Sequence, residues 1–328
     1  MDNGTTTATA NARGLHMTRS SRKSGKPETT QQRFANLIER PALDSCQNVL
    51  ILGDAGNSPG LDYLKTLIPV FSERGVRSEL HPIQLRVDKP VLPELDGIDL
   101  IILAGGDGAL MSLLRALGTN PIPVYGINFG RVGFLMNPAR DPSELVEQIL
   151  QGKCVEQRLP VLEAQWVTTT GDSGSASGVN DIVLERASGQ TVHLDVFIDK
   201  VRLNDYSGDG MVVATPAGST AYSLAAGGPV IHPEVFGILM TPLNAHRPVQ
   251  FHSLQFPVVL PLQTEIRLVG KGLEKRPIRV VVDGETHMDI QELGIRARGD
   301  FVRLLRLEGY QYVKGLVSRI IGETDRDD

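Results

Sequence analysis

The segment at residues 98–108 reads IDLIILAGGDG and joins an apolar run to a glycine-rich turn. Its branched side chains are typical of a strand that is buried on both faces of a sheet. Residues 109–117 have helical character, and Gly118 ends this helix. A strand, a glycine turn and a helix in this order predict a place for phosphate, because the first turn of a helix offers free N–H groups and a positive dipole end.

Asp107 is an unusual residue in such a turn, because a carboxylate repels phosphate. We therefore predict that it addresses a hydroxyl group beside the phosphates, as a hydrogen-bond acceptor or a general base. The neighbouring Gly106 and Gly108 have no Cβ atom and let a ligand approach the backbone closely. The alternative is a strand-ending turn in which Asp107 only caps the helix.

The first part of the chain alternates short apolar runs with amphipathic segments. This order predicts a Rossmann-like α/β domain over residues 46–153, with a mostly parallel sheet and with ligands at the carboxyl ends of its strands. The expected strands lie at residues 48–52, 76–85, 98–104 and 122–127, and the expected helices at 61–71, 109–117 and 142–150.

After about residue 155, runs rich in Val, Ile, Leu and Thr recur between turn residues, which predicts a β-rich domain over residues 154–305. The expected strands lie at residues 161–169, 181–184, 191–198, 211–215, 255–260, 266–269 and 278–282. The small residues at 171–178 predict a turn or flexible loop. Residues 304–321 are more helical in character, so we expect residues 306–328 to pack back onto the first domain, with a disordered acidic end.

Composition narrows the class of protein. The chain has 328 residues, 41% of them hydrophobic, and a net charge of −5, which gives no electrostatic case for binding nucleic acid. No apolar run reaches the roughly 18 residues that span a bilayer. Cys46 and Cys154 form neither a metal-ligand spacing nor a disulfide framework. We expect a cytoplasmic protein with a disordered tail at residues 1–45; a transit peptide is the alternative.

A second motif lies within the β-rich part, where residues 206–229 read YSGDGMVVATPAGSTAYSLAAGGP. A strand leads into a Pro/Gly turn and then into a helix of small residues. Small side chains let a ligand lie against the backbone, while Ser219 and Thr220 supply hydroxyls and Tyr222 a ring for stacking. The alternative is a tightly packed strand, turn and helix with Tyr222 in the core.

Four motifs occur in a characteristic order: GGDG at 105–108, GINFGRVGFL at 126–135, the pair Asn180-Asp181, and the long run at 208–229. Together they resemble the motifs of the NAD kinases, which transfer a phosphoryl group from ATP or polyphosphate to the 2′-hydroxyl of the adenosine ribose of NAD. GGDG alone is a weak signal, because lipid kinases and phosphofructokinases have similar loops. The long run is highly specific, and the resemblance covers residues 48–312.

The resemblance implies that Asp107 is the general base near the 2′-hydroxyl. A general base typically raises the reaction rate by about 10²–10⁴-fold. It implies nucleotide contacts at Gly106, Gly108, Asn180, Asp181, Asp209, Thr220, Ala221, Tyr222 and Ala225. Further candidates are Phe129, Arg131, Ser219, His246 and His252. It also implies NAD as substrate, Mg²⁺ with ATP, and a homodimer or homotetramer. No carboxylate cluster identifies ligands for Mg²⁺, so we expect phosphates and water to hold it.

The chain departs from the family pattern in two internal places. Asp181 stands where Glu is more usual, and residues 243–257 share the features of the family's histidine stretch between two sites. Whether His246 or His252 matches the family's histidine therefore stays open. Asp209 would lie near the nicotinamide end or a subunit contact. Asp283-Gly284-Glu285 predicts a tight hairpin turn.

Two other functions remain open from the sequence. A lipid or sphingoid-base kinase of the same broad superfamily would need a wide apolar entrance, whereas residues 215–229 carry small and hydroxyl side chains. A non-catalytic NAD-sensing protein would have little need for Asp107.

Overall fold

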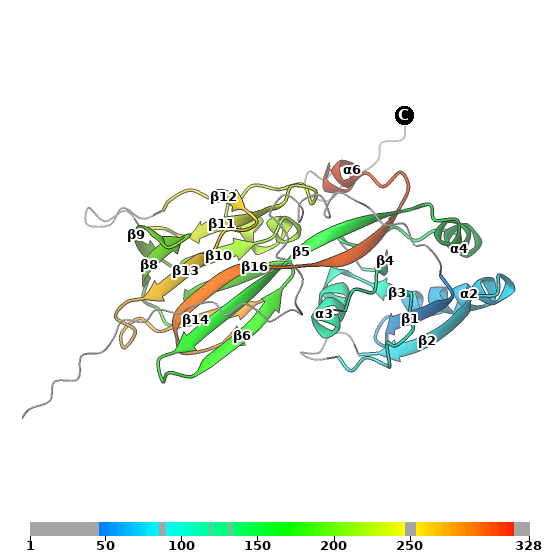
Figure 1. Cartoon of the computed structure of the whole chain (residues 1–328), viewed down its shortest axis with the longest axis horizontal. Helices are drawn as coiled ribbons and strands as arrows, with labels where there is room; N and C mark the ends of the chain where they lie inside the picture. The colour runs from blue at the N-terminus through cyan, green and yellow to red at the C-terminus, as the bar shows by residue number, and fades with distance from the viewer. Residues whose placement is uncertain (1–45, 85–89, 119, 131–132, 247–253, 318–328) are drawn as a thin grey trace, which may run out of the picture.

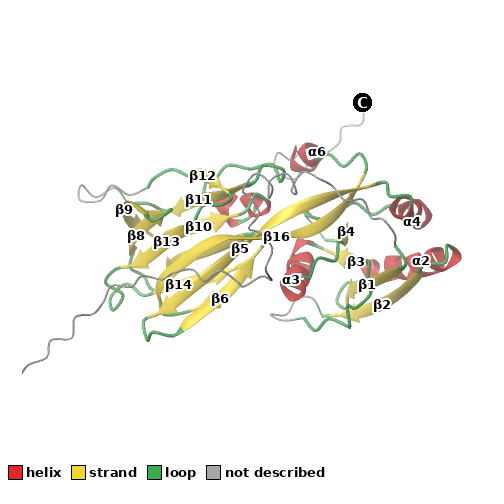
Figure 2. Cartoon of the chain, in the orientation of Figure 1, coloured by secondary structure: helices red, strands yellow, loops and turns green. Residues whose placement is uncertain are grey.

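The computed structural model describes residues 46–84, 90–118, 120–130, 133–246 and 254–317. The expected tail at 1–45, the acidic end and the candidates Arg131 and His252 lie outside these residues. The described chain has an α/β half, from β1 to α4, and a β-rich half, from β5 to β16, which lie side by side (Figure 1). Figure 2 shows that the longer helices belong to the α/β half.

The α/β half contains four parallel strands in the order β2-β1-β3-β4, as predicted. These strands are β1 (Asn48–Asp54), β2 (Arg77–Ile83), β3 (Leu100–Gly105) and β4 (Val124–Asn128). Every residue of β3 is buried, because helices cover both faces of the sheet. The apolar run that follows Asp99 therefore forms the central strand that its pattern predicts.

Three helices cover this sheet: α2 (Ser58–Glu73), α3 (Asp107–Leu117) and α4 (Pro142–Leu150). Leu67 of α2 and Val146 of α4 share one apolar cluster with Ile102 of β3. Leu110 of α3 belongs to a second cluster, with Leu103 on the opposite face of the same strand. Helix α3 thus lies on the face that turns toward the β-rich half (Figure 1).

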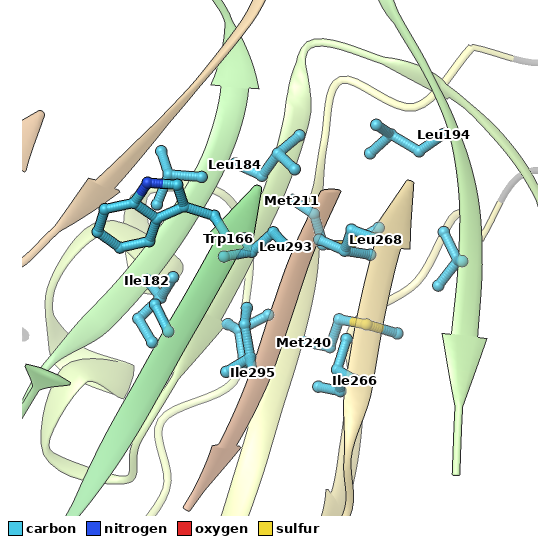
Figure 3. Packing of buried hydrophobic residues seen from close by; sticks show 14 of the residues in the cluster. Trp166, Ile182, Leu184, Leu194, Met211, Met240, Ile266, Leu268, Leu293 and Ile295 are labelled. Carbon is cyan, nitrogen blue, oxygen red and sulfur yellow. The ribbon is translucent and has the colours of Figure 1, made fainter. Parts of the chain in front are cut away.

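The β-rich half is a sandwich of two sheets. One sheet has the order β12-β11-β10-β7-β14-β15. The other continues from the α/β half as β16-β13-β8-β9; in addition, β5 pairs with β16, and β6 pairs with β5. Figure 3 shows the core between them, where Ile182 and Leu184 of β7 share a cluster with Leu293 and Ile295 of β16. The strands are β5 (Cys154–Thr168), β6 (Ser173–Gly178), β7 (Asp181–Arg186), β8 (Val192–Ile198), β9 (Val201–Gly208), β10 (Gly210–Ala214), β11 (Gly237–Leu243), β12 (Val258–Pro261), β13 (Ile266–Gly270), β14 (Ile278–Val282), β15 (Glu285–His287) and β16 (Ile290–Leu307).

Strand β16 connects the two halves. Near its start it pairs with β13, and near its end Leu304 pairs with Val124 of β4. Along its other edge it pairs with β5 over most of its length. A single sheet therefore runs from β2 in the α/β half to β9 in the β-rich half.

Two local predictions are wrong. Residues 173–178 form strand β6 instead of a loop, and a Cβ atom on Gly174 would lie 2.5 Å from the Trp166 ring. The small residues thus leave room for the indole of the neighbouring strand. Residues 304–307 are the end of β16, and among the described residues only α6 (Tyr312–Leu316) is helical after them. Leu304 of β16 pairs with Val124 of the first domain, and the packing of residues 306–328 onto that domain stays a prediction.

No helix among the described residues is long and apolar enough to cross a bilayer.

Candidate active site

The loops at the carboxyl ends of β1, β3 and β4 meet at one edge of the parallel sheet. The N–H of Phe129 donates to the Gly105 carbonyl at 2.7 Å, and the Asn57 side chain donates to the Phe129 carbonyl at 3.3 Å. A Cβ atom on Gly130 would lie 3.0 Å from the Cα of Gly106, so the two glycine turns touch through their backbones. The structure thus brings Gly106 and Phe129 together, as expected for a switch-point site.

Asp107 is the first residue of α3, and its carboxylate is held by a neighbouring turn. Its Oδ2 accepts the Phe134 N–H at 2.7 Å, and its Oδ1 accepts the Leu135 N–H at 3.1 Å. The cap residue of α3 is Gly106, which makes no side-chain cap bond. The alternative in which Asp107 only caps its helix is therefore wrong. Half-buried Asp107 stands beside exposed Gly108 at the helix N-terminus.

The turn that holds Asp107 is itself fixed from behind. Nη1 of Arg306 donates to the Leu135 carbonyl at 2.9 Å, and Nη2 donates to the side chain of Gln157 at 2.8 Å. The Arg306 side chain leaves only 2% of its residue surface exposed. The Asn137 amide bonds the carbonyls of Gly126 and Leu305, each at 3.0 Å. Strand β16 thus holds Leu135 and Asn137 in place, and this fixes the turn whose N–H groups orient Asp107.

A second group of predicted site residues surrounds the turn at residues 179–181. The carboxylate of Asp283 accepts the N–H groups of Val179, Asn180 and Asp181 at 2.7, 2.9 and 3.0 Å. Asp283 lies in the tight turn between β14 and β15, as predicted. Its φ of 45° is in the left-handed region, which Asp tolerates better than most residues. No local feature of the sequence indicates that this turn residue supports Asn180.

The long motif packs against this same turn. It forms η1 (Ala217–Thr220) and α5 (Tyr222–Ala225). The Thr215 N–H donates to the Asn180 carbonyl at 2.9 Å, and a Cβ atom on Gly218 would overlap that carbonyl. The backbone N–H of Tyr222 donates to the carboxylate of Asp181. The structure therefore brings Asn180, Asp181 and the 215–222 segment together.

The candidates in this segment differ in exposure. Tyr222 is 43% exposed, Ala225 is exposed, and Thr220 and Ala221 are half-buried. Ser219 is completely buried, and its hydroxyl bonds the Pro216 carbonyl and the Ile231 backbone. The expectation that Ser219 faces a ligand is wrong, because this hydroxyl already fixes the turn. The prediction that Tyr222 offers a ring to a ligand fits its exposure better than a core position does.

Burial perturbs the acid groups here. It raises the pKa of Asp181 to about 7, and the charge of Asp283 acts in the same direction. Burial also raises the pKa of Tyr222, with further contributions from the charges of Glu185, Asp209 and Asp181. Residues whose pKa is shifted by burial and by a specific charged neighbour are candidates for a functional site.

Asp209 and His246 lie toward the end of β10 that is away from Asp181, although the charge of Asp209 still acts on Tyr222. Asp209 precedes β10, whose other end, at Ala214, pairs with Asp181. One strand of this length spans roughly 15 Å. The carboxylate of Asp209 bonds Asn244 at 2.8 Å and pairs with Arg186 at 3.2 Å. His246 is exposed, and its N–H donates to the Ser207 carbonyl.

Helix α3 places the two main groups on either side of one apolar contact. Its residues Ala109 and Leu110 share a cluster with Val179 and Ala217 from the β-rich half. Asp107 begins this helix, and Val179 and Ala217 begin the two segments that carry Asn180 and Tyr222. The candidate site therefore lies between the two halves. A separate cavity of about 450 Å³, lined by Arg158, Phe236 and Tyr310 among others, includes none of the predicted site residues.

Comparison with known proteins defines the class. The ATP-NAD kinase N-terminal domain matches residues 82–154, and the ATP-NAD kinase C-terminal domain matches residues 179–297. The protein is thus a kinase, with one matched domain in each half of the fold. The NAD kinase of Marinobacter nauticus is 31% identical over 300 residues, which cover 87% of this chain and 94% of that protein. The NAD kinase of Chromobacterium violaceum is 37% identical over 219 residues, 65% of this chain and 73% of that protein.

The chain belongs to the NAD kinase family. Solved structures agree: yeast NADH kinase complexed with NADH has a TM-score of 0.70 at 25% identity, covering 86% of this chain and 89% of that one. An NAD kinase from Archaeoglobus fulgidus, in complex with ATP, shares the fold with a TM-score of 0.66 at 22% identity. The match covers 85% of this chain and 100% of that one. The family assignment favours an NAD kinase over both alternatives, the lipid kinase and the non-catalytic sensor.

Proposed function

We propose that this NAD kinase transfers the terminal phosphoryl group of ATP to the 2′-hydroxyl of the adenosine ribose of NAD, with Asp107 as general base. The observation that carries this proposal is the Asp107 carboxylate, held by two backbone N–H groups at the start of α3. It stands at the edge where the glycine turns meet and where the β-rich half packs on α3. Polyphosphate is the other donor to be tested.

In this mechanism the chain mainly binds and orients. Asn180 and Asp181 bond the ribose and adenine, and Tyr222 lies against the adenine through its exposed ring. Gly106 and Gly108 let the donor phosphates approach the start of α3, whose dipole favours negative charge. One Asp107 oxygen takes the proton of the 2′-hydroxyl as the 2′-oxygen of the ribose attacks the terminal phosphorus, while the bond from that phosphorus to the bridging oxygen breaks and ADP leaves with the bonding electrons. The N–H groups of Phe134 and Leu135, which bond the Asp107 carboxylate, keep it directed at the 2′-hydroxyl of the ribose.

Magnesium is expected with ATP, since it neutralises the charge of the phosphates. Within the described residues, no three acidic, histidine or cysteine side chains gather in a way that could hold a metal ion. The residues present do not build a magnesium cage, so we assign no step of the mechanism to the ion. Phosphates and water would carry it into the site.

The assembly and its location also belong to the proposal. We assign Asp209, whose charge acts on Tyr222, to the nicotinamide end of the bound NAD or to a contact with a second copy of the chain, as the family resemblance implies. A homodimer or homotetramer is the state that the family resemblance implies, and a cytoplasmic location is the expectation from the sequence analysis. Light scattering of the purified protein measures the number of copies.

The test is NADP formation by the purified protein with NAD, Mg²⁺ and either ATP or polyphosphate, with NADH as a parallel acceptor. Asp107→Asn keeps the size of the side chain but removes the base and turns one of the two acceptors for Phe134 and Leu135 into a donor, so we expect kcat to fall by about 10²-fold or more. NAD binding, measured by calorimetry, should change only slightly. Asp172→Asn, in the turn between β5 and β6, is the matched control and should leave kcat unchanged. Full activity of Asp107→Asn would show that the base is elsewhere.

A further inference from the structure

One arginine joins the helix of Asp107 to the turn of Asn180. Arg115 lies two turns after Asp107 on α3, and its Nη1 donates to the backbone carbonyl of Asp283 at 2.8 Å. Its Nη2 reaches Ser112 of the same helix at 3.2 Å, which fixes the direction of the guanidinium. Asp283 in turn holds the N–H groups of residues 179–181 with its carboxylate. A continuous path of hydrogen bonds therefore crosses from one half of the protein to the other.

Two features of this path are locally unfavourable. Nε of Arg115 is buried and has no hydrogen-bond partner within the described part of the chain, and leaving such a donor without an acceptor costs stability. The carboxyl group of Asp283 is also buried, and this burial raises its pKa, because the charged form loses its solvation. Buried polar groups that are kept at such a cost are candidates for a functional constraint.

We propose that Arg115 and Asp283 are positioning residues that fix the Asn180–Asp181 turn relative to Asp107. This inference rests on the proposed function, in which Asn180 and Asp181 hold the ribose and Asp107 takes its proton. Each of these tasks is done by a different half of the protein. The reaction therefore depends on the placement of one half against the other, which the path through Arg115 and Asp283 fixes.

The expected signature is a loss of kcat that is larger than the loss of NAD binding. Misplacement of reacting groups by about 1 Å can cost about 10²-fold in rate. NAD would still find Asn180, Asp181 and Tyr222 in the same relation to one another, because these residues share one half of the protein. A purely structural role would lower the amount of folded enzyme and leave kcat per folded molecule unchanged.

The experiment compares Arg115→Met with Arg276→Met, each measured for kcat, KM for NAD and thermal unfolding. Arg276 is the matched control, because its guanidinium bonds the carbonyl and hydroxyl of Thr191 within the β-rich half alone. We expect Arg115→Met to lower kcat per folded molecule at least 10-fold with KM for NAD within about 3-fold. Arg276→Met should keep the kcat of the unchanged protein.

Two further variants keep the test decisive if Arg115→Met fails to fold. Arg115→Lys keeps one donor and should recover part of kcat. Asp283→Asn tolerates the positive φ, but its amide presents a donor to one of the three N–H groups, so the turn should shift and kcat should fall. If kcat per folded molecule stays within 2-fold in Arg115→Met, or in both substitutes, the inference is wrong. If the unchanged protein phosphorylates NAD, that failure leaves the proposed function standing; if it does not, the proposed function itself fails.

Discussion

Asp181 and Asp283 place two carboxyl groups close enough for the charge of one to raise the pKa of the other. The backbones of the two residues are also bonded, because the Asp283 N–H donates to the Asp181 carbonyl at 3.1 Å. Within the described residues, the N–H of Tyr222 is the backbone donor to the Asp181 carboxyl group, whereas Asp283 accepts from three N–H groups. Asp181 therefore stays protonated up to near-neutral pH, a state in which it can donate to a ribose hydroxyl as well as accept from it.

This proton makes the stability of the protein depend on pH. The pKa of Asp181 is about 7 in the folded protein against 3.8 for an ordinary Asp, so the folded state binds the extra proton between these values. Its contribution to the free energy of unfolding falls as pH rises from about 4 to 7, by about 4 kcal/mol at most. Asp181→Asn should remove this fall while keeping an acceptor for Tyr222. Urea denaturation at pH 4.5, 6, 7 and 8 should show the variant gaining on the unchanged protein with pH; a constant difference would contradict the assignment.

Among individual residues, the sequence indicated those that stand in local motifs and missed those that contact the candidate site from distant positions in the chain. Asp107 and Asn180 stand in short motifs, so they could be singled out as candidates from the sequence, and their roles stay predictions. Asp283 supports Asn180 from 103 positions away, and Arg306 supports Leu135 from 171 positions away. Such contacts exist only after the sheet is assembled. Ser219 shows the opposite error, because its hydroxyl looked available in sequence and is used inside the fold.

Among the elements, the segment from Thr215 to Ala225 depends most on the absence of side chains. Gly218 lies directly on the backbone of Asn180, so η1 and the 179–181 turn approach each other as closely as two backbones can. This contact positions the N–H of Tyr222 at the Asp181 carboxylate. The small residues of the long motif are therefore a packing requirement of the site as well as room for a ligand.

Gly218→Ala tests this packing. The added methyl group would overlap the Asn180 carbonyl, so we expect a loss of about 1–3 kcal/mol in the free energy of unfolding. KM for NAD should rise, because Asn180 must move. Gly189→Ala is the control, since a Cβ there would have no neighbour within 4 Å, and it should change stability by less than about 0.5 kcal/mol. Equal effects of the two substitutions would mean that the contact at Gly218 is not tight.

The elements of the α/β half followed the sequence closely, because each strand and helix there is bounded by a cap or a glycine. Asp141 caps α4 and Gly118 ends α3, as predicted. Prediction was weaker in the β-rich half, where β6, β9, β11, β15 and β16 were not among the expected strands. Residues 173–178 have no apolar alternation, and they are a strand because β5 pairs with them and Trp166 covers Gly174. A segment of this kind becomes a strand because a neighbouring strand pairs with it, and its own sequence does not show this.

For the molecule as a whole, strand β16 makes the two halves depend on each other. Leu304 is 1% exposed and packs with α3 and Val124, while residues 292–295 of the same strand pair with β13. Unfolding either half would leave β16 without one of its partners. We therefore expect one cooperative transition for the described part of the chain.

Leu304→Ala tests this dependence by calorimetry. Removal of the buried side chain should lower the free energy of unfolding by about 2–5 kcal/mol and shift the single transition as a unit. Val259→Ala, at an exposed position of β12, is the control and should leave the transition in place. A second transition that stays unshifted in Leu304→Ala would show that the halves unfold independently.

The position of β16 near the end of the chain also affects how the protein is made. During synthesis, the parallel strands leave the ribosome first, but the edge of β4 stays without its partner until residue 304 has emerged. The edge of β13 waits for residues 292–295 in the same way. Unpaired edges of this kind recruit other chains. The nascent kinase should therefore depend on chaperones until β16 has emerged, and a chain that stops before β16 should aggregate.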